Sequence, residues 1–146
     1  MTGWLTASFR AHVVLLLGCA VLLVLAFVGA SPDGVDPTAL GLLATGVPRF
    51  PATGPALVPL LAASAVVIAQ AVALVAATRG RAEGRWALLT IAVVTAISRV
   101  IGTIATGDVL LALVVSAVWL LLAAVLFLPS SDGWFGAARG AREPRR

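Results

Sequence analysis

Four long apolar runs alternate with short polar segments along this chain. The runs cover residues of about 12–29, 56–78, 86–105 and 108–128. A helix of about 20 apolar residues crosses the roughly 30 Å hydrocarbon core of a bilayer. The pattern therefore predicts an all-α polytopic membrane protein, a bundle of four transmembrane helices that forms a single membrane domain over residues 1–146.

The connections between these runs differ in length. Residues 30–55 form the one long loop, and within it "DPTALGLLATG" predicts a short helix with Asp36 as its N-cap and Pro37 in its first turn. The apolar character of this helix predicts that it lies on the membrane surface or dips into it. Residues 129–146 form a polar tail, in which Pro129 is expected to end the fourth helix and Trp134 to lie among lipid headgroups.

Composition agrees with a membrane protein. Hydrophobic residues make up 61% of the chain and charged residues 11%, whereas soluble domains have an apolar share of roughly 45–50%. All ten basic residues are arginine, and lysine, asparagine and tyrosine are absent. Those three residues need A/T-rich codons, so the composition indicates a GC-rich, bacterial genome and a place in the bacterial cytoplasmic membrane.

The arginines predict the orientation of the chain. Eight of them fall on one side of a four-span path, Arg49 falls on the other side, and Arg99 lies inside a span. The eight are Arg10, Arg79, Arg81, Arg85, Arg139, Arg142, Arg145 and Arg146. By the positive-inside rule, both termini are cytoplasmic. The last four, together with Trp134, are expected to contact anionic lipid headgroups, and no basic face carries the exposed aromatics that nucleic-acid binding needs.

The second run carries a series of small residues at four-residue spacing. The series consists of Ala65, Ala69, Ala73 and Ala77. Membrane helices associate through close packing of small residues, so this series, and Gly102 in the third run, predict helix–helix contacts. Gln70 lies near the middle of the same run. It is expected either to make an interhelical hydrogen bond or to contact a substrate.

Arg99 is a permanent charge inside the third run. It shares a helix face with Thr95 and Thr103, while large aliphatic residues cover the other faces, so it is predicted to point into the bundle. A central arginine costs about 2.5–3.5 kcal/mol on insertion scales and needs partners. The candidates are Asp108 first, then Asp33 and Asp36 in the long loop, with Ser116, the face of Trp119 and carbonyls near Gly102 as further options.

Three roles are open for Arg99. It ties the third run to the loop and the fourth run, or it binds an anionic headgroup or substrate group, or it lines a proton or ion path. The absence of acidic residues deep in any run speaks against the path.

Catalytic chemistry is not indicated. His12 is the one histidine and Cys19 the one cysteine, and they are interpreted as an interfacial polar residue and a packing residue. The sequence has no nucleophile–base pair, no metal-ligand cluster and no phosphate-binding loop. We therefore expect no enzyme activity, no cofactor and no metal.

The stretch "SRVIGTIATGDVLLALVVSAVWLLL" resembles the small four-helix membrane proteins grouped as DoxX-like, with Arg99 at the family's basic position. The resemblance runs from the second run onward. It implies a four-helix bundle of largely undefined activity. The acidic residue that the family often carries in its last span is replaced by the region of Ser116 and Trp119 here.

Together these features predict a structural or accessory membrane protein that binds a partner protein or lipid through small-residue helix faces. The partner is another membrane protein or a second copy of this chain. The alternative is a small homo-oligomeric transporter or holin-like pore with the Arg99 face lining its path. A dry, packed face at Arg99 favours the first, and a continuous wet face favours the second.

Overall fold

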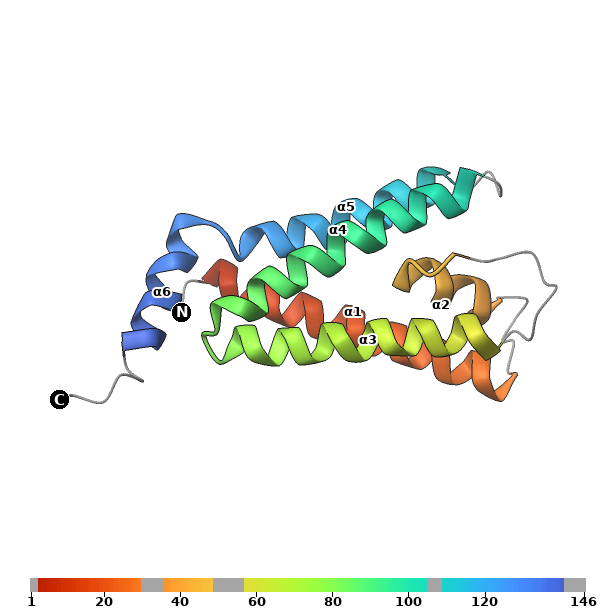
Figure 1. Ribbon diagram of the computed structural model, residues 1–146, viewed down its shortest axis with the longest axis horizontal. Helices are drawn as coiled ribbons and strands as arrows, with labels where there is room; N and C mark the ends of the chain where they lie inside the picture. Colours follow the sequence, from red (N-terminus) through yellow and green to blue (C-terminus); the bar gives the residue numbers. More distant parts are fainter. Residues whose placement is uncertain (1–2, 30–35, 49–56, 105–108, 141–146) are drawn as a thin grey trace.

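The computed structural model describes residues 3–29, 36–48, 57–104 and 109–140, and all regular elements in these ranges are helices. The helices in chain order are α1 (Gly3–Val28), α2 (Pro37–Thr45), α3 (Leu57–Thr78), α4 (Ala82–Ile104), α5 (Val109–Val125) and α6 (Pro129–Gly140) (Figure 1). The predicted all-α fold is therefore confirmed for the described residues.

Three of these helices are long and apolar enough to cross a membrane: α1, α3 and the segment Ala82–Thr103 of α4. The fourth apolar helix, α5, has 17 residues. At about 1.5 Å per residue it rises about 26 Å, which is at the lower end of what a bilayer core requires.

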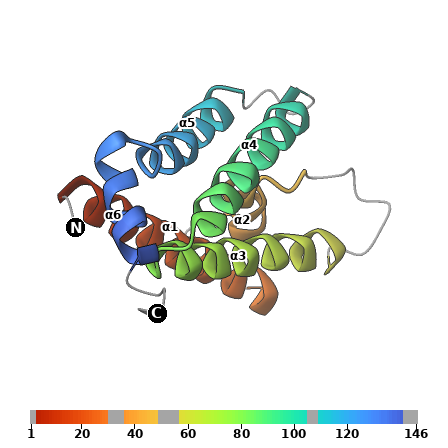
Figure 2. The same cartoon turned by 60° about the vertical axis from the view of Figure 1, so that its left-hand side comes forward.

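The long helices form two pairs that meet at one end and separate toward the other. α1 and α3 make up one pair and α4 and α5 the second, and α2 lies in the gap where the pairs diverge (Figures 1 and 2). The start of α1, the α3–α4 turn and α6 all lie at the opposite end of the bundle. We call these two ends the α2 end and the α6 end.

α1 begins at Gly3, nine residues before the predicted start of the first span. The reason is packing: Leu5 and Phe9 are buried in the core, and Ser8 donates a hydrogen bond to the carbonyl of Leu122 at 3.0 Å. His12 is consequently 1% exposed. His12 therefore packs inside the bundle, and its position at the membrane interface stays a prediction.

The alanine series of α3 divides between two faces. Ala73 and Ala77 are buried, whereas Ala65 and Ala69 are exposed. A four-residue step overshoots a turn of about 3.6 residues by about 40°, so the series drifts around the helix. The buried positions Ala63, Gln70 and Ala77 instead follow the seven-residue spacing that is typical of left-handed helix pairs.

α3 and α4 approach each other closely at Gly84, which the sequence analysis did not single out. A Cβ atom on Gly84 would lie 2.7 Å from the carbonyl oxygen of Ala73 and 2.8 Å from the carbonyl carbon of Ala76. Backbone therefore packs on backbone here, and only glycine leaves the room. The same contact explains why the Ala73–Ala77 half of the alanine series is buried.

The segment after α5 is a helix rather than an extended tail. α5 ends at Val125, earlier than the predicted end next to Pro129, and turns follow at Leu126 and Phe127. Pro129 is instead the first residue of α6. Proline suits that position because a first-turn N–H needs no partner within the helix. Trp134, predicted to lie among headgroups, is half-buried against protein, and the neighbouring Phe135 is 2% exposed.

The predicted short helix in the long loop is confirmed as α2. Asp36 is its N-cap and accepts hydrogen bonds from the backbone N–H groups of Thr38 at 3.0 Å and Ala39 at 3.2 Å. Gly46 ends the helix in the left-handed conformation, with φ of 75°. α2 packs on α1 and α3, and a Cβ atom on its Gly41 would touch the side chain of Leu23 at 3.4 Å.

Candidate functional site

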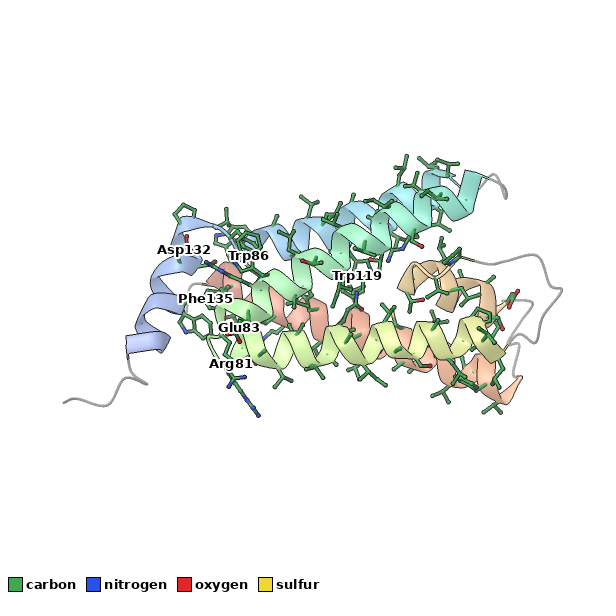
Figure 3. The ribbon with its side chains drawn as sticks, in the orientation of Figure 1. Arg81, Glu83, Trp86, Trp119, Asp132 and Phe135 are labelled. Atoms are coloured by element: carbon green, nitrogen blue, oxygen red, sulfur yellow. The ribbon has the colours of Figure 1, made fainter. Side chains whose placement is uncertain are left out.

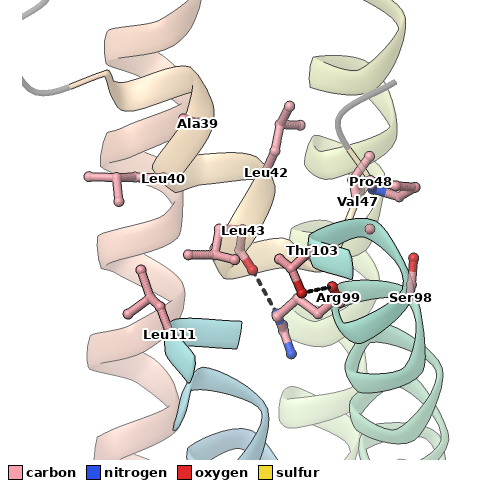
Figure 4. A pocket seen from close by; sticks show the side chains of 11 residues that line it. Ala39, Leu40, Leu42, Leu43, Val47, Pro48, Ser98, Arg99, Thr103 and Leu111 are labelled. Atoms are coloured by element: carbon pink, nitrogen blue, oxygen red, sulfur yellow. Dashed lines mark hydrogen bonds between the residues drawn. The ribbon is translucent and has the colours of Figure 1, made fainter. Parts of the chain in front are cut away.

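The candidate site is built around Arg99, which α4 carries into the gap between the two helix pairs. Arg99 is 2% exposed. Its Nε donates to the carbonyl oxygen of Leu43 at 2.6 Å and its Nη2 to that of Ala44 at 2.8 Å. Its Nη1 donates to the hydroxyl of Ser116 on α5 at 3.2 Å. One side chain thus joins α4 to the end of α2 and to α5. Figure 4 shows the bond to Leu43.

The two carbonyls belong to the last turn of α2, where a helix leaves its final C=O groups without partners. The carbonyl of Leu42 is satisfied by the N–H of Val47 at 3.1 Å. That of Leu43 accepts a long bond from Gly46 at 3.3 Å as well as the bond from Arg99. Arg99 therefore supplies donors to carbonyls that the turn alone leaves weakly bonded or open, and its charge lies at the negative end of the helix dipole.

Small residues let the end of α2 reach α4. A Cβ atom on Gly46 would lie 2.6 Å from the carbonyl oxygen of Thr95, and one on Gly102 would lie 3.3 Å from Cβ of Pro48. The predicted packing role of Gly102 is thus directed at the segment that follows α2. Glycine at 46 meets two needs at once, because its φ is positive and a side chain there would collide with α4.

The structure describes one of the three predicted aspartate partners. Asp108 and Asp33 lie outside the described residues. Asp36 caps the N-terminus of α2, about 10 Å along the helix from the carbonyls that bind Arg99, at about 1.5 Å per residue. The expected aspartates were therefore not the whole set of partners. In the described residues the guanidinium binds carbonyl oxygens at the end of a helix, and no residue type in the sequence marks such carbonyls.

The threonines on the Arg99 face are buried and bonded to their own helix. Thr95 Oγ1 donates to the carbonyl of Ile91 at 2.8 Å, and Thr103 Oγ1 donates to the carbonyl of Arg99 at 2.9 Å. Such bonds to the preceding turn use the donor of each hydroxyl. Thr95 and Thr103 therefore make the face small enough for α2 to approach.

A cavity of about 200 Å³ adjoins Arg99 at the α2 end. Its wall is mostly apolar, with Arg99, Thr103 and Ser98 as the residues that bear side-chain polar groups (Figure 4). The apolar wall is formed by Ala39, Leu40, Leu42, Leu43, Val47, Pro48, Gly102 and Leu111. Leu40 and Leu111 are 37% and 47% exposed, so the cavity opens between α2 and α5.

Two further predicted residues lie deeper in the bundle. Gln70 is 2% exposed, and its Oε1 has no hydrogen-bond partner among the described residues. Trp119, considered as a π face for Arg99, packs edge-to-face against His12 with ring centroids 5.9 Å apart and points inward between the helices (Figure 3). The Nδ1 atom of His12 lies 2.9 Å from the carbonyl oxygen of Ser8.

A second polar cluster, at the α6 end, was missed by the sequence analysis. Arg85 at the start of α4 forms an ion pair with Asp132 in the first turn of α6. Its guanidinium carbon also lies 5.0 Å from the ring centroid of Phe127 and 5.1 Å from that of Phe135. Trp86 and Phe135, together with Asp132, surround this point in Figure 3. The sequence did offer a signal for this cluster, namely the pair Arg85 and Trp86 together with the aromatic residues that follow the fourth apolar run.

The predicted lipid-contact residues are only partly described. Arg142, Arg145 and Arg146 lie outside the described residues, as does the side chain of Arg139. Trp134 packs edge-to-face against Phe9 and Phe135, with ring centroids 6.2 Å and 4.8 Å apart. Arg81, in the α3–α4 turn, points away from the bundle (Figure 3).

The described residues hold no group of three or more His, Cys, Asp or Glu side chains that could bind a metal ion. The site instead offers a buried guanidinium beside an apolar cavity. Such a combination can bind backbone carbonyls or an anionic group. In comparisons with known proteins, no family model, no curated protein and no solved structure matches this chain.

Proposed function

We propose that this chain is a structural or accessory integral membrane protein that binds a partner membrane protein through a small-residue face of α3. The single observation that carries the proposal is the closure of the polar face of α4. Thr95, Arg99 and Thr103 are at most 7% exposed, because α2 and α5 cover them. A face that is packed in this way favours an accessory role over a pore lined by Arg99.

The face of α3 available to a partner is a continuous exposed stripe. Its members repeat at steps of three and four residues and are all alanine or valine: Val58, Ala62, Ala65, Ala69, Val72 and Ala76. Five of them are exposed and Ala76 is half-buried. Small residues let two membrane helices approach closely and gain packing energy that lipid contact does not give. The neighbouring exposed positions Leu61 and Ile68 are large, so the stripe differs from the lipid-facing surface beside it.

The membrane topology is part of the same proposal. We propose four spans with both termini in the cytoplasm, α5 being the short fourth span. The α6 end carries Arg10 near the start of α1, Arg79 and Arg81 in the α3–α4 turn, and Arg85 in α4, which supports a cytoplasmic α6 end. A DoxX-like relationship and a bacterial origin remain expectations that accompany this proposal.

The experiment that tests the function is cross-linking in native membranes. Cys19 is replaced by alanine, and single cysteines are introduced at Ala65 or Ala69 in the stripe and at Ile68 beside it. Each cysteine is labelled with benzophenone maleimide, which on illumination inserts into C–H bonds of a neighbouring protein and needs no thiol there. A defined cross-linked product is expected from positions 65 and 69 and none from 68. A leucine at Ala62 should reduce the product, because a larger side chain separates the helices. Equal cross-linking at Ile68 and Ala65, or none at either stripe position, would refute the proposal.

The pore alternative is tested separately. Purified protein in liposomes should leave the vesicles impermeable to small ions and to protons. Leakage that disappears with Arg99→Met would establish the alternative in place of the accessory role. Labelling of cysteines at Ser31 and Ser130 tests the topology: Ser31 should react from outside and Ser130 only from inside.

A further inference from the structure

The cavity beside Arg99 combines an apolar wall with a cation at its inner end. Leucines of α2 and Leu111 of α5 form the wall, and Arg99 closes one side (Figure 4). Cavities that bind small molecules have this composition, a mostly apolar lining with a few placed polar groups. The wall is therefore chemically suited to an alkyl chain and the closed side to an anion.

The charge on Arg99 is only partly balanced by the groups that it contacts. Its three hydrogen bonds in the described structure go to two carbonyls and a hydroxyl, all neutral. The end of a helix carries about −0.5 of an elementary charge, so roughly half of the positive charge is left. A guanidinium has five N–H donors, and two of them remain after these three bonds. An anionic oxygen would balance the charge and use the remaining donors.

The size and the opening of the cavity limit what accompanies that anion. A volume of about 200 Å³ equals the space of about seven water molecules at roughly 30 Å³ each, which suits one short stretch of alkyl chain and not two chains side by side. The cavity opens between Leu40 and Leu111, which are partly exposed. A longer chain can leave through this opening toward the lipid around α2 and α5.

We propose that this cavity is a binding site for a single-chain anionic amphiphile, with a fatty-acid carboxylate on Arg99 and its alkyl chain along the α2 leucines. The site is separate from the α3 stripe, so it stands or falls independently of the proposed partner binding. Arg99 then has two roles: it binds the carbonyls at the end of α2, and it binds the carboxylate of the amphiphile.

The test uses the full chain in nanodiscs of neutral phosphatidylcholine, and the probe is radiolabelled octanoate in equilibrium dialysis against protein-free nanodiscs. We expect saturable uptake of one octanoate per chain, with octanol bound at least about tenfold more weakly because hydrogen bonds to charged groups are stronger. Octyltrimethylammonium should not compete. Arg99→Gln should lower the affinity at least about tenfold, with folding checked by circular dichroism.

A second pair of variants leaves Arg99 intact. Ala39→Phe places a ring in the cavity and should abolish octanoate binding, whereas Ile68→Phe puts the same ring on the exposed surface of α3, outside the stripe, and should leave octanoate binding unchanged. If Ala39→Phe binds octanoate like the unmodified chain, the cavity is not the site and the proposal fails.

Four other outcomes would also overturn it. Uptake equal to that of empty nanodiscs, or equal affinity for octanoate and octanol, would show that no anion site exists. Displacement of octanoate by phosphatidylglycerol in the nanodisc would show that a two-chain phospholipid is the occupant. Binding that appears only in Asp108→Asn would show that the carboxylate of Asp108 occupies Arg99.

Discussion

Replacing Gly84 with alanine is the sharpest test of how α3 and α4 pack. The new Cβ atom would lie 2.7 Å from the carbonyl oxygen of Ala73, whereas ordinary contacts begin at 3.4 Å. The backbone nitrogen of Ala77 would lie closer still, so the helices must separate by more than about 0.7 Å. Because the obstacle is backbone, no side-chain rotation can relieve it. Overpacking of this kind costs about 1–3 kcal/mol, against a gain of up to about 1 kcal/mol in helix propensity. With the full propensity gain the net loss is about 0–2 kcal/mol, and relative to a glycine-to-alanine change without a clash the loss is about 1–3 kcal/mol.

Gly18→Ala is the matched control, because it makes the same substitution within an apolar helix. Gly18 is exposed on α1, and nothing lies within 4 Å of the position of its Cβ atom. Alanine there should leave the free energy of unfolding unchanged or raise it by up to about 1 kcal/mol. The assay is reversible unfolding in mixed micelles titrated with a denaturing detergent. Equal free energies of unfolding for the two variants would refute the close α3–α4 contact.

Three further predictions concern the two polar clusters. Arg99→Met removes the donors to the end of α2, so amide hydrogen exchange should accelerate across α2 and stay unchanged in α1 and α3; unchanged exchange in α2 would contradict the clamp. Asp36→Ala removes the N-cap and should destabilise α2 locally by about 1 kcal/mol, which should appear as faster amide exchange of Thr38 and Ala39. Unchanged exchange would contradict this and show that water replaces the carboxylate as acceptor. Arg85→Met removes the ion pair and both ring contacts that hold α6. In a background without Cys19, a cysteine in place of the buried Ser131 should therefore become reactive toward a thiol reagent. Protection equal to that in the parent would show that α6 docks without Arg85.

The helices and the N-cap of α2 could be predicted because their causes are local. Runs of apolar residues mark the long helices, and Asp36 followed by Pro37 marks the start of α2 through the chemistry of the first turn. The end of α2 at Gly46 follows the same logic. The true starts of α1 and α4 were missed because contacts with α6 and α3, rather than hydrophobicity, extend these helices beyond the apolar runs.

The partners of Arg99 could be predicted only in part. Its inward direction follows from the threonines on its face and the aliphatic residues elsewhere, and Ser116 follows from matching depth in the next helix. The carbonyls of Leu43 and Ala44 could not be identified, because every residue has a carbonyl and only the fold determines which ones lack a partner. Aspartates were the expected partners because an acidic residue can be identified in a sequence, whereas an unpaired carbonyl cannot.

The carbonyls at the end of α2 need hydrogen-bond donors because of where this helix ends, and a guanidinium supplies them. A nine-residue helix that enters the gap between apolar helix pairs brings carbonyls away from water, and an unsatisfied carbonyl in such surroundings costs about 1–3 kcal/mol. Gly46 and Val47 close part of the turn with their own N–H groups. Arginine closes the rest because its adjacent Nε and Nη2 donors reach two successive carbonyls at once, while the third nitrogen reaches α5. A lysine offers donors on a single atom and lacks this geometry. The insertion cost of the charge is thus offset by the backbone that it allows the bundle to bury, and any anion that enters the adjoining cavity meets a guanidinium already held in place.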